Sequence, residues 1–404
     1  MVLQGLHSIL AKFGLFFLWA VYATAYTTLT EDTLRSLPTV GEDFDIKSGA
    51  LLSPILVPRV PGSEGSKQVL NHFVDFFKTN LPKWEISFQN STSTTPRSGG
   101  RQIPFVNMIV TRDPPWATAG EVSRLTLVAH YDSKITPYGF IGATDSAAPC
   151  AMLLHIARSI DEALTQKWEA AQAAGMEQDL LEDTVNKGVQ ILLLDGEEAF
   201  ATWTDTDSLY GARSLAENWE TTFHPALSTY RTPLSSISLF VLLDLLGAAS
   251  PRIPSYFKST HWAYQKLAAL ENQFRSLGLF ESSPNHKKQR SATEEERGTE
   301  PVFLPEAQKS DGRWQGGLIG DDHVPFMQRG VEILHMIPTP FPSVWHHMED
   351  DGEHLDLPTC RDWAQLFMAF TAEWMDLEGF MRQSARLKEH IGDPKKRDSK
   401  KDEL

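Results

Sequence analysis

The stretch Leu125-Thr126-Leu127-Val128-Ala129, which runs into His130-Tyr131-Asp132-Ser133, carries the pattern that decides the fold of this 404-residue chain. Similar apolar runs occur at Val189 to Leu194 and at Ile237 to Leu243. Their length and branched side chains are typical of strands that are buried on both faces. A helical pattern begins near Cys150, between the first two runs. Strands alternating with helices predict an α/β fold, with a mixed, largely parallel central sheet flanked by helices on both faces.

The rest of the chain adds elements of both kinds. Apolar and aromatic spacing predicts helices over Gln68 to Phe77 and Arg361 to Phe380. Strand patterns cover three further segments: Trp84 to Phe88, Ile103 to Val110 and Val331 to Ile337. The segment from Ser282 to Gln315 is polar and charged, and we interpret it as a mobile surface insertion. We expect a single domain across residues 26–381.

Composition narrows the class of protein. The chain has 37 Lys+Arg against 52 Asp+Glu and a formal net charge of −15, which argues against nucleic acid as a partner. Hydrophobic residues at 41% and charged residues at 22% describe an ordinary globular protein. Two cysteines cannot form a disulfide framework or a cysteine-based zinc cluster, so a bound metal must be held by His and carboxylates.

The N-terminus has the pattern of a secretory leader. Lys12 precedes an apolar run from Phe13 to Ala23, and Ala23-Thr24-Ala25 supplies small residues in an A-x-A arrangement. We interpret residues 1–25 as a signal peptide cleaved after Ala25. An uncleaved membrane anchor is the alternative, although the run is short for a bilayer span of about 20 residues.

The C-terminus carries an address for the same pathway. Residues 382–404 form a charged tail that ends in Lys401-Asp402-Glu403-Leu404, the signal for retrieval to the endoplasmic reticulum. We therefore expect the KDEL retrieval receptor as a partner and the lumen of the endoplasmic reticulum as the location. Asn90-Ser91-Thr92 is a glycosylation sequon that agrees with this compartment.

Acidic and imidazole side chains follow each predicted buried strand. They occur at His130 and Asp132, at Asp145, at Asp195 to Glu198, at Asp244, at Asp321 to His323, and at His346 and His347. Buried carboxylates are costly unless protons, partners or a metal neutralise them. Convergence at strand ends is most simply explained by zinc, with Asp145, Glu198 and His346 as ligands and one coordination position open for catalysis.

Each of these residues also has a structural explanation when taken alone. Asp145 could cap a helix, His346 could be a surface histidine, and Asp244 could satisfy neighbouring backbone donors. Glu197 and Glu198 cannot both point in one direction on an extended segment, so one can bind metal while the other faces a substrate. The ordered set favours a metal site.

Several motifs together resemble the glutaminyl-peptide cyclotransferases, relatives of the zinc aminopeptidases. The similarity extends from about His130 to the helix ending near Phe380. It rests on these segments in order: His130 to Lys134, Gly142 to Ala147, Asp195 to Phe200, Asp207 to Gly211, Leu243 to Leu245, Asp321 to Phe326, and Phe341 to His346. The resemblance implies a zinc aminopeptidase-like fold and the closure of an N-terminal glutamine to pyroglutamate with release of ammonia.

The resemblance also implies roles for particular residues. It implies one zinc ion held by Asp145, Glu198 and His346, with Glu197 as the residue that transfers protons. Asp244 and Asp321 would form a hydrogen-bonded acidic pair behind Glu197. A substrate pocket would be lined by Trp203, Trp345 and Phe341, and His130 would lie next to the metal ligands.

Two positions depart from the family's pattern. Members often carry a cysteine where Ala129 stands, paired with one at the position of Cys150. Here that disulfide is impossible, so we expect Cys150 to be a buried free thiol and Cys360 a distant core residue. Gly320 replaces a polar side chain before Asp321, which bears on the contact to the substrate's backbone.

Two other functions stay open at this point. His130, Asp145, Glu198, Asp244 and His346 could supply both metals of a two-zinc aminopeptidase. Against this, Asp145 is followed by Ser146-Ala147-Ala148-Pro149, where the aminopeptidase relatives usually show Asn or Asp and a later Gly. An inactive binding protein on the same fold is the other alternative, although it would have no need for the intact ligand set. For the oligomeric state, a monomer is the default expectation.

Overall fold

A six-stranded mixed sheet forms the centre of the computed structural model, which describes residues 27–175, 186–287, 298–310, 312, 314 and 319–381. The strands lie in the order β1-β2-β4-β3-β5-β6. Their bounds are Glu85–Ser93 (β1), Ile103–Arg112 (β2), Ser123–His130 (β3), Lys187–Leu194 (β4), Ile237–Leu243 (β5) and Ile333–Met336 (β6). All the strands predicted from sequence are present; β5 has the predicted bounds, and the other five are shifted at one or both ends.

The pairing within the sheet changes direction once. β1 pairs antiparallel with β2, and β2 pairs antiparallel with β4. From β4 onward the neighbours are parallel, with β3 between β4 and β5 and β6 at the edge beside β5. The mixed, largely parallel sheet expected from sequence is therefore confirmed. The parallel part brings four strand ends to one edge of the sheet.

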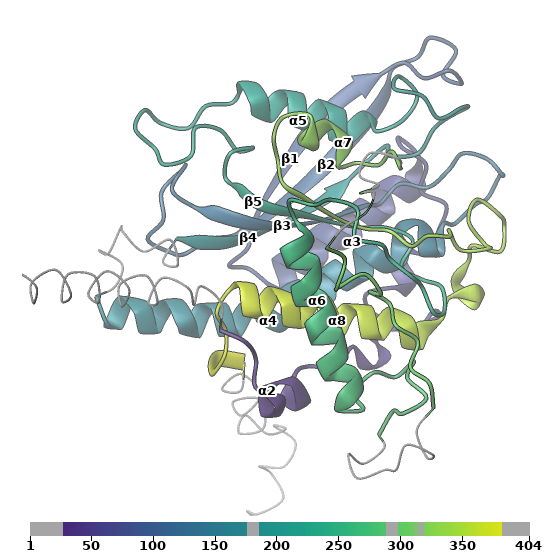
Figure 1. The fold of residues 1–404 in the computed structure, drawn as a ribbon. Coiled ribbons are helices and arrows are strands. Elements are labelled where there is room, and N and C mark those ends of the chain that lie inside the picture. Colours follow the sequence, from purple (N-terminus) through teal and green to yellow (C-terminus); the bar gives the residue numbers. More distant parts are fainter. Residues whose placement is uncertain are drawn as a thin grey trace, which may run out of the picture.

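Helices cover both faces of the sheet (Figure 1). The helices of the described residues are α2 Glu31–Ser36, α3 Glu64–Asn80, α4 Ala148–Ala173, α5 Tyr210–Thr221, α6 His261–Ser276, α7 Val324–Met327 and α8 Leu357–Trp374. Short turns of helix occur at Gly41–Phe44, Ser53–Ile55, Ala143–Ala147 and Gly352–His354. In Figure 1, α4, α6 and α8 lie on one side of the sheet, with α5 and α7 on the other.

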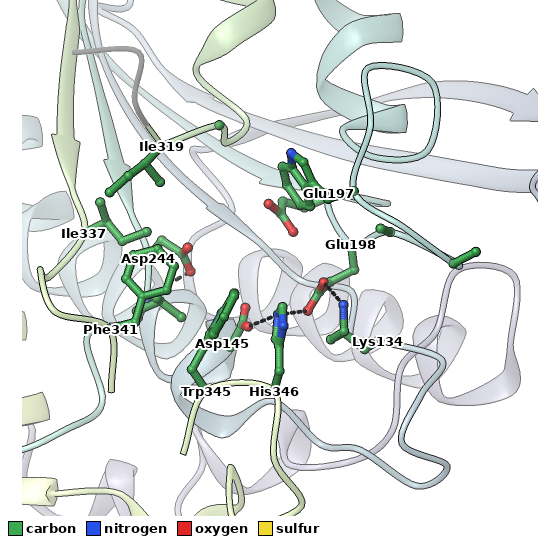
Figure 2. Close-up of a pocket in the computed structure, with 15 residues that line it drawn as sticks. Lys134, Asp145, Glu197, Glu198, Asp244, Ile319, Ile337, Phe341, Trp345 and His346 are labelled. Atoms are coloured by element: carbon green, nitrogen blue, oxygen red, sulfur yellow. Dashed lines mark hydrogen bonds and ion pairs between the residues drawn. The ribbon is translucent and has the colours of Figure 1, made fainter. Parts of the chain in front are cut away.

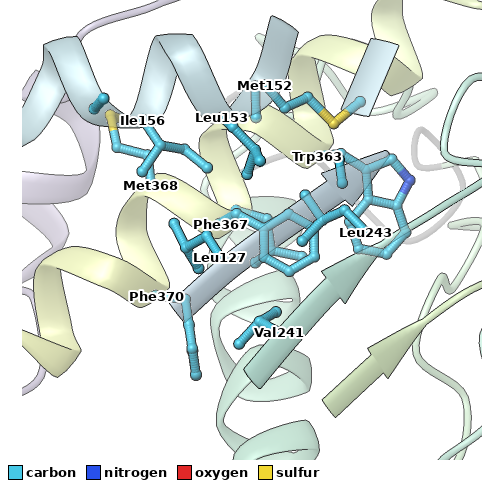
Figure 3. Close-up of a cluster of buried hydrophobic side chains, with 14 of the residues drawn as sticks. Leu127, Met152, Leu153, Ile156, Val241, Leu243, Trp363, Phe367, Met368 and Phe370 are labelled. Carbon is cyan, nitrogen blue, oxygen red and sulfur yellow. The ribbon is translucent and has the colours of Figure 1, made fainter. Parts of the chain in front are cut away.

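The two sides of each buried strand contribute to different cores. Leu127 and Val241 pack into a large core with α4 and α8, where Figure 3 shows Leu153 and Phe367. Their chain neighbours on the opposite face, such as Leu242, pack into a smaller core with α5 and α7. Burial on both faces explains why these strands appear in the sequence as continuous apolar runs.

The C-terminal helix differs in position from its prediction. It was expected over residues 361–380, and α8 covers Leu357–Trp374. It begins earlier because Asp356 caps it, accepting a hydrogen bond from the backbone N–H of Thr359 at 3.1 Å. It ends earlier because Asp376 has a left-handed backbone, with φ 52°, which does not continue a helix.

Several predictions fall wholly or partly outside the described residues. The leader at 1–25 and the tail at 382–404 lie outside them, as do residues 288–297 of the expected surface insertion. Described parts of that segment include buried side chains, Phe303 and Leu304 among them. Asn90 of the sequon is exposed on β1. Among the described helices, none has the length and apolar character needed to cross a membrane.

Candidate active site

The side chains singled out by sequence gather where the parallel strands end. His130 is the last residue of β3, and Asp244 directly follows β5. The segment 195–198 follows β4, and His346 lies in the loop after β6. Because these strands run parallel, their carboxyl ends meet at one edge. Figure 2 shows Glu197, Glu198, Asp244 and His346 around one pocket.

Asp145, Glu198 and His346 bring three possible metal-ligand atoms together. His346 Nε2 lies 3.5 Å from Asp145 Oδ2 and 3.6 Å from Glu198 Oε1. Ligand atoms around tetrahedral zinc lie roughly 3.3 Å apart, since each Zn–N or Zn–O bond is about 2.0–2.1 Å long. Glu198 Oε1 is buried and has no hydrogen-bond partner in the described part of the chain. A cation among the three side chains would satisfy this oxygen, so the donor set fits zinc.

Asp132 and Lys134 orient the two glutamates. Asp132 accepts hydrogen bonds from the backbone N–H of Glu197 at 3.0 Å and of Glu198 at 3.2 Å. Lys134 Nζ donates to Glu198 Oε2 at 3.0 Å, which leaves Oε1 facing His346. Figure 2 shows Glu197 apart from the series of contacts that joins Lys134, Glu198 and His346. The two adjacent glutamates therefore face different partners, as expected from the sequence.

The loop that carries His346 holds an uncommon backbone conformation. His346 has φ 60°, in the left-handed region that residues other than glycine rarely adopt. The ring of Trp345 stacks on the His346 imidazole, with 3.7 Å between ring centroids. Such conformations persist where the surrounding structure enforces them, and they cluster at functional sites.

His130 connects the acidic residues behind the three candidate ligands. Its Nε2 lies 2.9 Å from Asp145 Oδ1 and 3.6 Å from Asp244 Oδ1, and its Nδ1 lies 3.4 Å from Asp132 Oδ1. Burial alone would lower the pKa of His130, but the close interactions with these three carboxylates raise it well above its usual value. His130 thus lies next to the candidate ligand Asp145.

Glu197 is a buried carboxylate at the side of the pocket. Burial raises its pKa well above the usual value for a glutamic acid. The negative charges of Glu198, Asp321 and Asp322 raise the pKa further, while His130 opposes the shift. A raised pKa makes the protonated form of a glutamate more accessible, which suits a residue that both accepts and releases a proton.

Asp244 and Asp321 have separate hydrogen-bond partners. Asp244 Oδ1 accepts hydrogen bonds from the hydroxyl of Ser146 and from the backbone N–H of Leu245. Asp321 Oδ2 lies 2.6 Å from His335 Nε2. Burial and then the charge of Asp321 raise the pKa of Asp244 to about 6. Electrostatic coupling therefore links the two carboxylates, and the direct hydrogen bond between them stays a prediction.

An aromatic cavity of about 440 Å³ opens beside these carboxylates. Phe341 and Trp345 pack edge to face, with 4.9 Å between ring centroids. Trp203 is 41% exposed, and its indole lies against Gly320, where an added Cβ would be 3.3 Å from Trp203 Nε1. The cavity's lining includes all three predicted aromatic residues together with Lys134, Asp145, Glu197, Glu198, Asp244, Ile319, Ile337 and His346.

A hydrogen-bonded turn holds the segment that carries Trp203. The carboxylate of Asp207 accepts from the backbone N–H groups of Phe200, Ala201 and Thr202, at 3.0, 2.8 and 2.9 Å. The hydroxyl of Tyr210 also donates to Asp207, at 2.8 Å. The buried carboxylate of Asp207 thus fixes the backbone that precedes Trp203 at the edge of the pocket.

Sequence reasoning assigned no role to four residues that contact the site. Asp132 contacts the backbone of Glu197 and Glu198, and Lys134 contacts the carboxylate of Glu198. Ser146 contacts Asp244, and His335 contacts Asp321. A signal was present for all four. Asp132 and Lys134 lie within the motif that follows β3, and Ser146 lies within the motif Gly142 to Ala147. His335 is a lone polar residue inside an apolar strand. Both free thiols are buried, as expected for Cys150 and Cys360.

Comparison with known proteins shows which family of enzymes this chain resembles. Residues 108–371 match the sequence model of peptidase family M28. This range contains the three candidate zinc ligands and Glu197.

Individual sequences and a solved structure identify a narrower family. The chain is 38% identical over 333 residues to glutaminyl-peptide cyclotransferase of Gloydius blomhoffii, covering 81% of this chain and 80% of the relative. It is 36% identical to the glutaminyl-peptide cyclotransferase-like protein of Bos taurus, covering 81% and 74%. The crystal structure of Macrostomum lignano glutaminyl cyclase superposes with a TM-score of 0.65 at 29% identity, covering 86% of this chain and 93% of that one. The chain belongs to the glutaminyl-peptide cyclotransferase family.

Proposed function

We propose that this protein converts an N-terminal glutamine of peptides and proteins to pyroglutamate and releases ammonia, using one zinc ion held by Asp145, Glu198 and His346. The observation that carries the proposal is the buried Glu198 Oε1, which has no hydrogen-bond partner among the described residues and lies 3.6 Å from His346 Nε2 at the side of an aromatic pocket. Family membership supports the same reaction.

Ring closure makes modest demands on the protein. The attacking amine and the target amide belong to one residue, so the reaction has a high effective molarity. Zinc, when bound, would polarise the γ-carbonyl oxygen and stabilise the negative charge that develops there. Glu197 accepts a proton from the α-amine during the attack and delivers it to the departing nitrogen.

The other site residues hold the substrate and its leaving group. His335 fixes the carboxylate of Asp321, which would accept a hydrogen bond from the leaving amide nitrogen with Asp244 behind it. Trp203, Phe341 and Trp345 enclose the short glutamine side chain and exclude competing water.

One observation favours the two-zinc aminopeptidase as a second candidate. His130, Asp145 and Asp244 form another buried group of possible ligands, and it shares Asp145 with the first group. Two features oppose a second ion. Asp145 Oδ1 is 2.9 Å from His130 Nε2, and Asp244 Oδ1 accepts from the hydroxyl of Ser146. The atoms that would bind a second metal already have hydrogen-bond partners, so we propose a single zinc.

One combined measurement separates the two candidates. The purified full chain is analysed for zinc and then incubated separately with a Gln-peptide and a Leu-peptide. We expect about one zinc per chain, together with ammonia release from the Gln-peptide and no shortening of either peptide. Two ions per chain with release of free leucine would support the aminopeptidase instead. A protein with zinc but neither activity would support the inactive binding protein.

We further propose that the protein acts on secretory proteins in the lumen of the endoplasmic reticulum. The proposal rests on the leader at 1–25 and on Lys401 to Leu404, with the exposed Asn90 available for glycosylation. Removing the last four residues should move the protein from the cell to the medium. Intracellular retention of that variant would argue against retrieval by the KDEL receptor.

A further inference from the structure

Two buried side chains outside the ligand set bind the backbone that carries Asp145. Arg59 is 0% exposed, and Asp350 is 1% exposed. They contact consecutive parts of the segment Ile141 to Asp145, which precedes α4. The segment is irregular: Gly142 has φ 62°, and a Cβ added there would lie 2.1 Å from the carbonyl oxygen of Asp145. A turn of this kind needs support from its surroundings.

Arg59 supplies that support from one side. Its guanidinium donates to the carbonyl oxygens of Ile141 and Gly142, the latter at 2.9 Å, and lies 3.4 Å from that of Asp145. Its backbone N–H donates to Ser133 Oγ at 2.9 Å, which joins it to the loop after β3. Within the described residues Arg59 forms no ion pair with a carboxylate, so its buried charge is directed at these backbone carbonyls.

Asp350 supplies the support from the other side. Its Oδ1 accepts from the backbone N–H of Thr144 at 2.7 Å, and its carbonyl oxygen accepts from that of Ala143 at 3.0 Å. Its own N–H donates to the carbonyl of His347 at 2.9 Å. Asp350 therefore joins the loop that carries His346 to the turn that carries Asp145.

We propose that Arg59 and Asp350 are positioning residues that hold Asp145 and His346 in register before zinc binds. The inference rests on the zinc site proposed above. A ligand set that is already ordered does not lose the entropy of ordering two loops when the ion binds. Partners of metal ligands typically change metal affinity by about 10–100-fold when they are removed.

The chain offers a matched control for Asp350. Asp362 is also 1% exposed, and its carboxylate likewise accepts from backbone N–H groups, those of Glu281 and Ser282. Zinc affinity is measured by competition with a chromogenic chelator, and thermal unfolding is measured on the metal-free protein. We expect Asp350→Ala to lower zinc affinity by about 10-fold or more. Asp362→Ala should destabilise the fold and leave zinc affinity at the wild-type level.

Two further variants test the geometry. Asp350→Asn keeps an oxygen for the Thr144 N–H, so it should recover most of the zinc affinity that Asp350→Ala loses. Arg59→Lys keeps the charge but not the forked donor, so it should weaken zinc binding, whereas Arg275→Lys, at the buried pair with Glu271, should not. Hydrogen exchange of metal-free protein should show faster exchange at residues 141–147 in Asp350→Ala, and unchanged exchange there in Asp362→Ala.

The outcomes separate this inference from the proposed function. Wild-type protein without zinc affinity would overturn the zinc site, and this inference with it. Zinc binding by folded Asp350→Ala and Arg59→Lys at wild-type affinity would overturn the inference alone. An equal loss of affinity in Asp362→Ala and Asp350→Ala would overturn it as well. If Asp350→Ala fails to fold, the zinc affinities of Arg59→Lys and of its control Arg275→Lys test the inference instead.

Discussion

Glu197 and Glu198 are chain neighbours with different surroundings. Glu198 meets Lys134 on one oxygen and His346 on the other, whereas Glu197 lies among the buried charges of His130, Asp321 and Asp322. The difference arises because Asp132 binds both backbone N–H groups and fixes the turn between them. At the scale of a residue, the site is built from backbone hydrogen bonds that set where each carboxylate points.

This arrangement predicts opposite effects for two similar substitutions. Glu197→Gln removes the proposed proton-transferring group and keeps the candidate ligands, so cyclisation should fall by about 10²–10⁴-fold while zinc content is retained. Glu198→Gln removes a ligand one residue away and should lower zinc content directly. Ammonia release and metal analysis on the same samples test both. Unchanged turnover in folded Glu197→Gln would remove Glu197 from its assigned role.

At the scale of elements, α4 connects the site to the large core. Its N-terminus follows the turn that carries Asp145, and most of its first turns are buried. His155 lies on this helix, 1% exposed. Burial and the neighbouring charge of Arg158 lower the pKa of His155 to about 4. The native protein therefore holds this histidine in its neutral form.

The buried histidine predicts a pH dependence of stability. Between its unfolded value of 6.5 and about 4, the unfolded chain binds a proton that the native protein does not. The free energy of unfolding therefore falls as the pH decreases through this window. The free energy of unfolding should fall less between about pH 7 and about pH 5 when His155 is replaced with Gln, by roughly 2 kcal/mol. Urea unfolding of the wild type and of His155→Gln at the two pH values measures this difference. An equal decrease in the free energy of unfolding in both proteins would contradict a neutral, buried His155.

The packing of α8 against the sheet predicts the cost of a core truncation. Phe367 is 0% exposed and lies with Leu153 and Val241 in the cluster of Figure 3. Phe367→Ala should lower the free energy of unfolding by about 3–5 kcal/mol, because it removes apolar contacts and leaves a cavity. Leu227→Ala is the control, since Leu227 is 103% exposed and should change stability little. Denaturant titrations of the wild type and of the two variants measure these changes in the free energy of unfolding.

At the scale of the whole molecule, the candidate ligands come from three separate segments. Asp145 precedes α4, Glu198 follows β4, and His346 follows β6. A zinc ion bound among them would join parts of the chain that are far apart in sequence, and it would bind the native state alone. Its binding free energy is therefore added to the stability of the fold.

Removal of zinc should lower stability without unfolding the chain. With 1,10-phenanthroline we expect the melting temperature to fall by about 5 °C, while the two hydrophobic cores keep the protein folded. The isomer 1,7-phenanthroline cannot bind one ion with both nitrogens and serves as the control. Differential scanning calorimetry measures the effect. Equal melting temperatures with both isomers, together with full activity, would contradict the zinc site.

Local patterns in the amino-acid sequence were enough to predict the sheet and the candidate ligands. Strands buried on both faces appear as continuous apolar runs, so Ile237 to Leu243 could be placed to the residue. The carboxylates follow these runs directly, which predicts that Glu198 and Asp244 lie at strand ends. Both signals are local, because each depends on residues close together in the chain.

The groups that support the candidate ligands could be identified only from the folded structure. Arg59 meets the carbonyl of Gly142, and Asp350 meets the N–H of Thr144, across 83 and 206 positions of the chain. His335 lies on β6, and its side chain reaches Asp321, which lies in the chain segment before α7. A backbone carbonyl has the same chemistry at every position, so no pattern of side chains indicates which one a distant residue binds. That choice depends on how the loops pack in three dimensions.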